Sequence, residues 1–64
     1  MVVNDARNPQ WGDAGNTYIN LEVQFVGDAT YYEFTASPLD PEAHGVDIYN
    51  RAVAEEWGTV AAYS

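Results

Sequence analysis

The single histidine, His44, lies among acidic residues in the stretch 40–58, which reads DPEAHGVDIYNRAVAEEWG. On a helix, Asp40 and Asp47 would lie one turn to either side of the imidazole. This grouping raises the question of a reactive site, but nucleophilic catalysis also needs an activated Ser or Cys and an oxyanion hole. The chain has no cysteine, and none of its serines is placed to suggest a nucleophile. We therefore interpret His44 as a solvent-facing helix residue that pairs weakly with an acid.

No other set of residues meets the needs of a cofactor. A zinc site normally takes three or four ligands, and one histidine among carboxylates falls short of that. The alternating ligands and the final glutamate of an EF-hand calcium loop are missing. Gly12, Gly15 and Gly27 do not form a phosphate-binding pattern, and there is no lysine to complete one. A catalytic pair of carboxylates needs a cleft, for which so short a chain leaves little room. The sequence therefore predicts neither an enzyme nor a cofactor.

The charge is strongly one-sided, with ten acidic residues against Arg7 and Arg51 and a formal net charge of −8. Direct binding to a nucleic-acid backbone needs clustered Lys and Arg, and anionic lipid would repel this chain in the same way. The simplest interpretation of the acids is a solubilising surface. The alternative is an acidic inhibitor that imitates nucleic acid and binds a basic host protein.

The sequence shows no sign of a membrane or secretory destination. No apolar run approaches the ~18 residues of a membrane span. The first residues, MVVNDARNPQW, lack the basic start and apolar stretch of a signal peptide. We expect a cytosolic protein without a membrane partner.

The elements that would position these residues form one small domain over residues 1–64. Residues 18–26 alternate between apolar and polar side chains, and residues 30–36 alternate again after a Gly-Asp-Ala turn at 27–29. We predict an antiparallel hairpin, with a short first strand at residues 1–6 on its free edge. The turn formers in residues 8–16 predict a loop.

A helix is predicted after the strands. Asp40 suits the N-cap, Pro41 the first helical position and Gly58 the closing left-handed residue, which gives about eighteen helical residues. On a helical wheel the apolar arc contains Gly45, Val46, Ile48, Tyr49, Ala52 and Val53, and His44 lies on the opposite, wet side. We expect Gly45 to permit close approach of the helix to the sheet, under the ring of Tyr32 or Phe34. The expected fold is α+β: a three-stranded antiparallel β-meander with one C-terminal helix packed on one face (β-β-β-α).

The outer face of the predicted sheet is the best candidate for a contact with another protein. Nothing remaining in the chain is long enough to cover it, and tyrosines among polar groups suit an interface. The candidate contact residues on this face are Tyr18, Asn20, Glu22, Tyr31 and Glu33. Trp11, which is either a lid on the core or an exposed anchor, and Trp57 are further candidates. The edge strand at 30–36 is an alternative contact point.

The order of several motifs resembles that of small, mostly uncharacterised proteins of phages and prophages, encoded in tail and tail-fibre regions. The motifs that carry the resemblance are Trp11-x-Asp13-Ala14, Phe34-Thr35-Ala36, Asp40-x-Glu42-x-His44-Gly45 and Gly58 before a terminal Val-Ala-x-Tyr. That family carries a basic residue and a glycine at two positions where this chain has Val46 and Glu55. The resemblance implies a non-enzymatic structural or tail-assembly accessory protein that binds a tail or assembly protein. It also implies a location in the bacterial host cytoplasm during assembly, or in the virion.

Overall fold

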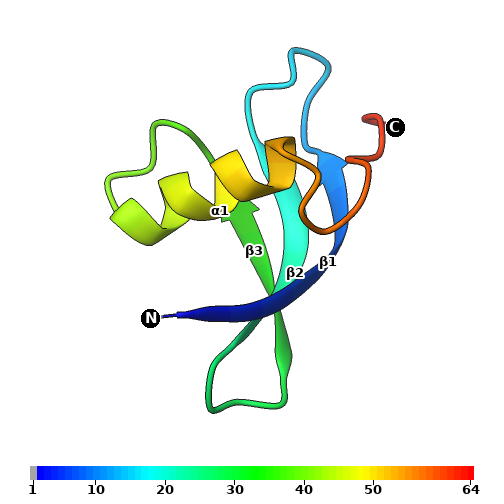
Figure 1. Ribbon diagram of the computed structural model, residues 1–64. Helices are drawn as coiled ribbons and strands as arrows, with labels where there is room; N and C mark the ends of the chain where they lie inside the picture. The colour runs from blue at the N-terminus through cyan, green and yellow to red at the C-terminus, as the bar shows by residue number, and fades with distance from the viewer. Residues whose placement is uncertain (1) are drawn as a thin grey trace.

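A computed structural model describes residues 2–64, and within that range the chain forms one three-stranded antiparallel sheet followed by one helix (Figure 1). The strands lie in the order β1-β2-β3, and the helix α1 packs on one face of the sheet. The bounds are Val3–Trp11 for β1, Ile19–Phe25 for β2, Tyr31–Ala36 for β3 and Ala43–Val53 for α1. The predicted β-β-β-α fold is confirmed.

The central strand β2 behaves as its alternation predicts. Ile19, Leu21 and Val23 point into the core and are almost wholly buried. β2 pairs with β3 through six consecutive residue pairs, from Ile19 opposite Ala36 to Gln24 opposite Tyr31, without a register shift. The pleat of the backbone places alternate side chains on opposite faces, so the alternation in β2 puts its apolar side chains on the inner face.

The first strand is longer than predicted. β1 continues through Trp11, so the expectation of a loop over residues 8–16 is wrong for residues 8–11. Two register shifts, between Val3 and Asp5 and between Arg7 and Gln10, let the strand continue past residues that favour turns. Asn8 takes a left-handed conformation (φ 56°), which asparagine tolerates better than most residues. The expected strand began at residue 1, which lies outside the described residues.

The segment after the helix covers the outer edge of β1. Ala61 forms a parallel bridge with Gln10: the Trp11 N–H donates to the Ala61 carbonyl and the Ala61 N–H donates to the Pro9 carbonyl, each at 2.9 Å. The Gln10 side chain also donates to the Ala62 carbonyl at 3.2 Å. Pro9 has no N–H of its own, so this edge offers few free donors.

The helix has eleven residues instead of about eighteen, and it begins later than predicted. Asp40 is not the N-cap. Its carboxylate accepts a hydrogen bond from the Glu42 N–H at 2.8 Å, which makes a local turn in place of a helical one. Glu42 takes the N-cap position with an extended backbone and without a side-chain capping bond.

The helix also ends earlier, at Val53, and Gly58 does not close it. The Glu55 N–H donates to the Ala52 carbonyl at 3.0 Å and the Glu56 N–H donates to the Arg51 carbonyl at 3.1 Å. This pair of bonds is a Schellman motif, whose closing residue must adopt a left-handed conformation. Glu55 is that residue, with φ 62°, while Gly58 (φ 94°) makes the next turn.

The core lies between the inner faces of the three strands and the inner face of α1. Ile48 and Ala52 are fully buried against it, and Tyr49 lies at its rim. Val53, predicted to be in the apolar arc, is 47% exposed because the helix ends there. Replacing Ile48 with Ala would cost about 2–5 kcal/mol.

His44 and Gly45 have neighbours that differ from those predicted. The His44 ring lies 5.9 Å from the Phe34 ring, centroid to centroid, and the side chain is half-buried instead of solvated. Gly45 is buried, but a Cβ added there would lie 2.0 Å from the Asp40 Oδ2 atom and not against an aromatic ring. The glycine therefore makes room for the Asp40 turn and not for the sheet.

Candidate interaction surface

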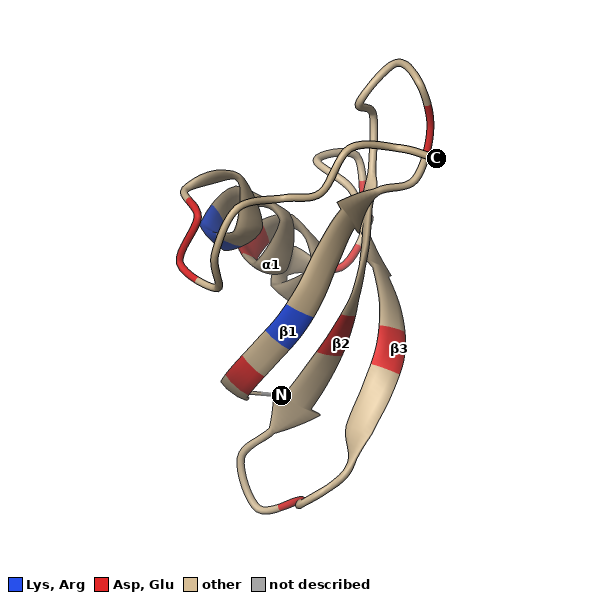
Figure 2. Cartoon of the chain, turned by 90° about the vertical axis from the view of Figure 1, so that its right-hand side faces the viewer, with Lys and Arg blue, Asp and Glu red and all other residues tan. Residues whose placement is uncertain are grey.

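The outer face of the sheet presents polar side chains from all three strands, and no described element covers it (Figure 2). The strand registers align these side chains in rows across the sheet. One row is Arg7, Glu22 and Glu33, and a second is Gln10, Asn20 and Thr35. A third is Asp5, Gln24 and Tyr31. Four of the predicted contact residues, Asn20, Glu22, Tyr31 and Glu33, therefore lie together on one face.

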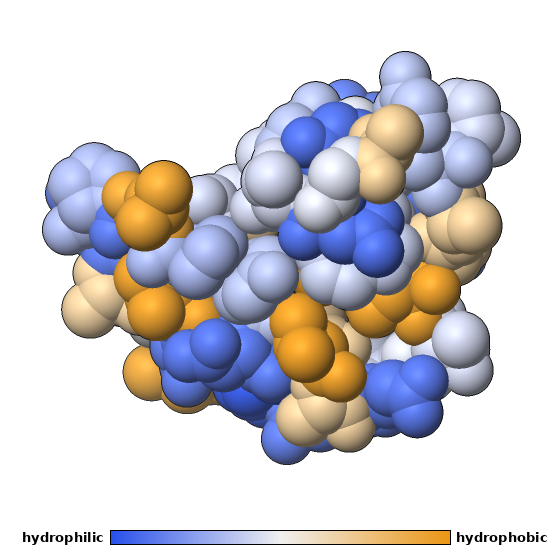
Figure 3. All heavy atoms as spheres, turned by 90° about the horizontal axis from the view of Figure 1, so that it is seen from above, coloured by the Kyte–Doolittle hydropathy of each residue, from blue (hydrophilic) through white to orange (hydrophobic). Residues whose placement is uncertain are grey.

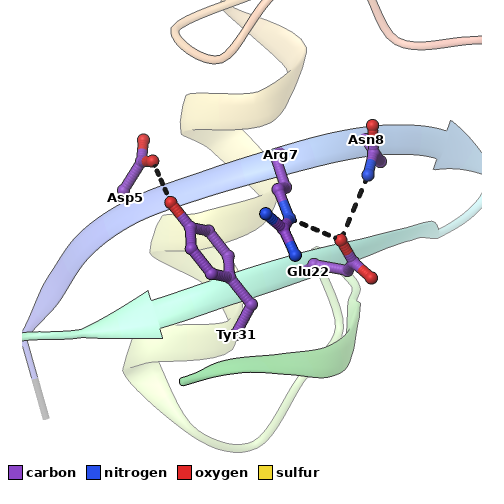
Figure 4. Close-up of polar contacts among 5 residues, drawn as sticks. All are labelled: Asp5, Arg7, Asn8, Glu22 and Tyr31. Carbon is purple, nitrogen blue, oxygen red and sulfur yellow. Dashed lines mark hydrogen bonds and ion pairs between the residues drawn. The ribbon is translucent and has the colours of Figure 1, made fainter. Parts of the chain in front are cut away.

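Arg7 is the centre of a hydrogen-bonded group on this face (Figure 4). Its Nε donates to the Glu22 Oε1 atom at 2.7 Å, and the Asn8 amide donates to the same oxygen at 3.1 Å. The guanidinium lies 3.9 Å from the centre of the Tyr31 ring, within the range of a cation–π contact. The Tyr31 hydroxyl in turn donates to the Asp5 carboxylate. The result is a network of contacts that joins β1 to β2 and β3.

The network has an electrostatic signature. The hydrogen bonds from Arg7 and Asn8 hold the pKa of Glu22 below its usual range. The hydrogen bond to Asp5, whose negative charge disfavours a phenolate, raises the pKa of Tyr31 above its usual value. Each shift favours the protonation state that its group already has at neutral pH.

Glu33 differs from its neighbour because its charge is not compensated. It lies directly opposite Glu22 on the adjacent strand, yet no residue within 2–64 forms a hydrogen bond or an ion pair with it. Like charges opposite one another in a sheet disfavour the pairing. Glu33 borders a shallow hollow of about 650 Å³, whose polar lining comprises Asn8, Gln10, Asn20, Glu22, Glu33 and Thr35. The outer face thus combines a concave surface with a carboxylate, Glu33, that has no ion-pair partner among residues 2–64.

The remaining predicted contact residues lie elsewhere. Trp11 is half-buried against the core and makes an edge-on contact with Tyr49 (ring centroids 6.2 Å apart), which favours the lid interpretation. Trp57 is half-buried beneath the Arg51 guanidinium at 4.8 Å. Tyr18 lies just before β2 and leans on Gly12, where a Cβ would come within 2.0 Å of its ring. Trp11 and Trp57 therefore lie away from the outer face, whereas Tyr18, which pairs with Gly12 beyond the end of β2, lies outside the three rows.

Sequence reasoning missed the contribution of β1 to this face. Asp5 and Arg7 alternate with the buried Ala6, which is a signal for a strand. The left-handed Asn8 and the following Pro9 interrupt that pattern, so the residues that contact Glu22 fell partly in a predicted loop.

The acidic residues do not gather into one surface. Figure 2 shows them on all three strands, on the helix and in the connections. Both arginines are engaged, Arg7 with Glu22 and Arg51 with Asp47 and Glu56. In the part of the chain that the structure describes, no three His, Asp or Glu side chains are close enough to hold a metal ion.

Exposed apolar residues lie in several places, and one hollow is lined by Val2, Phe25, Val26 and Tyr32 together. Seen from above in Figure 3, hydrophobic atoms form several spots separated by hydrophilic ones. The most exposed large apolar side chain is Leu39 (89%), in the connection between β3 and α1. No helix within residues 2–64 is long and apolar enough to cross a membrane.

Comparison with protein families, with curated proteins and with solved structures finds no match for this chain.

Proposed function

We propose that this protein is a non-enzymatic binding protein that contacts a partner protein through the outer face of its sheet. The observation that carries the proposal is the combination on that face of a pre-ordered network around Arg7 and an uncompensated Glu33 beside a hollow. Side chains already held in place lose little conformational freedom when they bind, so they favour recognition. An uncompensated carboxylate gives the face a preference for a positively charged partner group.

We further propose phage tail assembly as the setting, with a tail or assembly protein as the partner. This part of the proposal is supported by the order of motifs such as Trp11-x-Asp13-Ala14 and Asp40-x-Glu42-x-His44-Gly45. The binding role does not depend on the setting, so the two are tested separately.

Site-specific photocrosslinking tests the binding face. A photoreactive phenylalanine analogue at Asn20 would place the probe in the polar hollow, and the same analogue at the exposed Asn50 on α1 serves as a matched control. We expect one defined adduct from position 20 and none from position 50 in cells that produce phage. Equal adducts from both positions, or none from either, would refute the outer face as the contact surface.

The identity of the crosslinked protein tests the setting. A tail or tail-assembly protein in the adduct, and co-purification with assembling particles, is the expected result. If the Asn20 probe instead captures a host protein that particles lack, the binding face stands and the tail role is wrong.

A further inference from the structure

The two long edges of the sheet differ in how they are protected. The β1 edge has two register shifts and Pro9, and Ala61 pairs with it. The β3 edge has no proline and no register shift against β2, and no residue in the described range pairs with its far side. β3 therefore presents unpaired backbone donors and acceptors in the geometry that another strand needs.

We infer that the free edge of β3 accepts an extended segment of the partner protein, which adds to the sheet as a fourth strand. Recognition of this kind takes its affinity from main-chain hydrogen bonds and its specificity from alternate side chains. The inference rests on the proposed binding function and adds the form and the chemistry of the partner segment.

The charge of the outer face specifies which side chains the added segment should carry at its outward-pointing positions. Side chains of an added strand that point outward would lie beside Tyr31, Glu33 and Thr35. Glu33 has no compensating charge among residues 2–64, and the chain carries a net charge of −8. Opposite charges on adjacent strands stabilise pairing. The outward positions of the segment should therefore carry Lys or Arg.

The inner side of β3 specifies which side chains the added segment should carry at its inward-pointing positions. Tyr32 is 46% exposed and Phe34 is half-buried, so the edge retains apolar surface on this side. In Figure 1 the first turns of α1 project beyond β3, in front of the sheet. The exposed Leu39 belongs to the connection that leads into those turns. Apolar side chains at the inward positions would cover this surface.

A second copy of the chain does not meet these requirements. It would bring another net charge of −8 and its own Glu33 to an edge that already has an excess of negative charge. The segment that fits is a strand in which basic and apolar residues alternate, from a partner of positive charge.

A pair of synthetic peptides tests the inference. The first is Lys-Val-Lys-Val-Lys-Val-Lys, and the second has the same composition with the lysines and valines in separate blocks. We expect the alternating peptide to bind at least about tenfold more tightly than the block peptide, which corresponds to about 1.4 kcal/mol. Hydrogen exchange should show new protection at the β3 amides that point away from β2.

Two variants with the same change in charge complete the test. Glu33→Lys should weaken binding of the alternating peptide at least about tenfold, whereas Glu55→Lys, beyond the other end of α1, should leave it within about twofold. Equal loss in both variants, equal affinity for the two peptides, or no binding up to about 1 mM would overturn the inference. Protection of the β3 edge by self-association without peptide would overturn it as well. None of these results would change whether the Asn20 probe forms adducts. Failure of the strand-edge inference is therefore distinguishable from failure of the binding function.

Discussion

Glu55 is the residue at which a single substitution should stabilise this protein most clearly. It closes the Schellman motif of α1 with φ 62°, a conformation that a side chain with a Cβ adopts at a cost of about 1–2 kcal/mol. Glycine avoids that cost but has more freedom in the unfolded chain, which offsets about 0.4–1 kcal/mol. Glu55 is exposed, and no described residue forms an ion pair with it, so removal of its side chain should cost little stability. We expect Glu55→Gly to stabilise the fold by about 0.5–1 kcal/mol.

The assay is thermal unfolding followed by circular dichroism. For a domain of this size 1 kcal/mol corresponds to about 4–8 °C, so the expected rise in Tm is about 2–8 °C. Glu55→Ala is the matched control, because it removes the same charge and keeps the Cβ in the left-handed conformation. Ala54→Gly is the second control, since Ala54 has φ −74° and a glycine there should lower the Tm.

The pattern of these three variants decides between backbone conformation and charge. If Glu55→Ala raises the Tm as much as Glu55→Gly, the gain comes from the reduced negative charge and the conformational reasoning is refuted. A fall in Tm for Glu55→Gly would mean that the helix does not end in the motif described above.

Three further substitutions test other parts of the structure. Arg7→Gln should raise the pKa of Glu22 toward its ordinary value, which carboxyl NMR would measure. Because that pKa is depressed in the fold, stability is lost as the pH falls through the acidic range in which Glu22 becomes protonated, and the variant should lose less stability than the wild type. Gly45→Ala should destabilise the wild type, but it should stabilise a protein that already carries Asp40→Gly by about 1 kcal/mol. If denaturant unfolding shows that the effects of the two substitutions on the free energy of unfolding simply add, the contact between the two residues is contradicted. His44→Ala should cost about 1 kcal/mol through loss of its ring contact, and an unchanged Tm would place the histidine in solvent.

The hairpin was predictable because its signal is local. Residues Ile19 to Phe25 alternate strictly, and an error of one residue in register would expose every buried side chain of β2. The helix was predictable in type and place but not in length. The turn at Asp40 delays the start of the helix, and the left-handed Glu55 ends it early. The residue types that usually cap helices, Asp40 and Gly58, predicted other ends.

The candidate surface was predictable only where regular strands carry it. Asn20, Glu22, Tyr31 and Glu33 follow from alternation on β2 and β3. The partner that organises them, Arg7, comes from β1, whose register changes on both sides of it. A bulge is stabilised by the strand opposite and leaves no reliable pattern in the sequence of its own strand.

The bridge between β1 and the segment at Ala61 has a consequence for the order of folding. Gln10 and Ala62, which share a hydrogen bond, are 52 residues apart, whereas the meander and the helix are joined by short connections. Closing so long a loop is slow relative to forming a hairpin, so this bridge should be the last to form and the first to open. Until the segment at Ala61 has paired with it, the β1 edge is open to other strands. During that interval Pro9, which has no N–H to offer, is the residue that discourages aggregation.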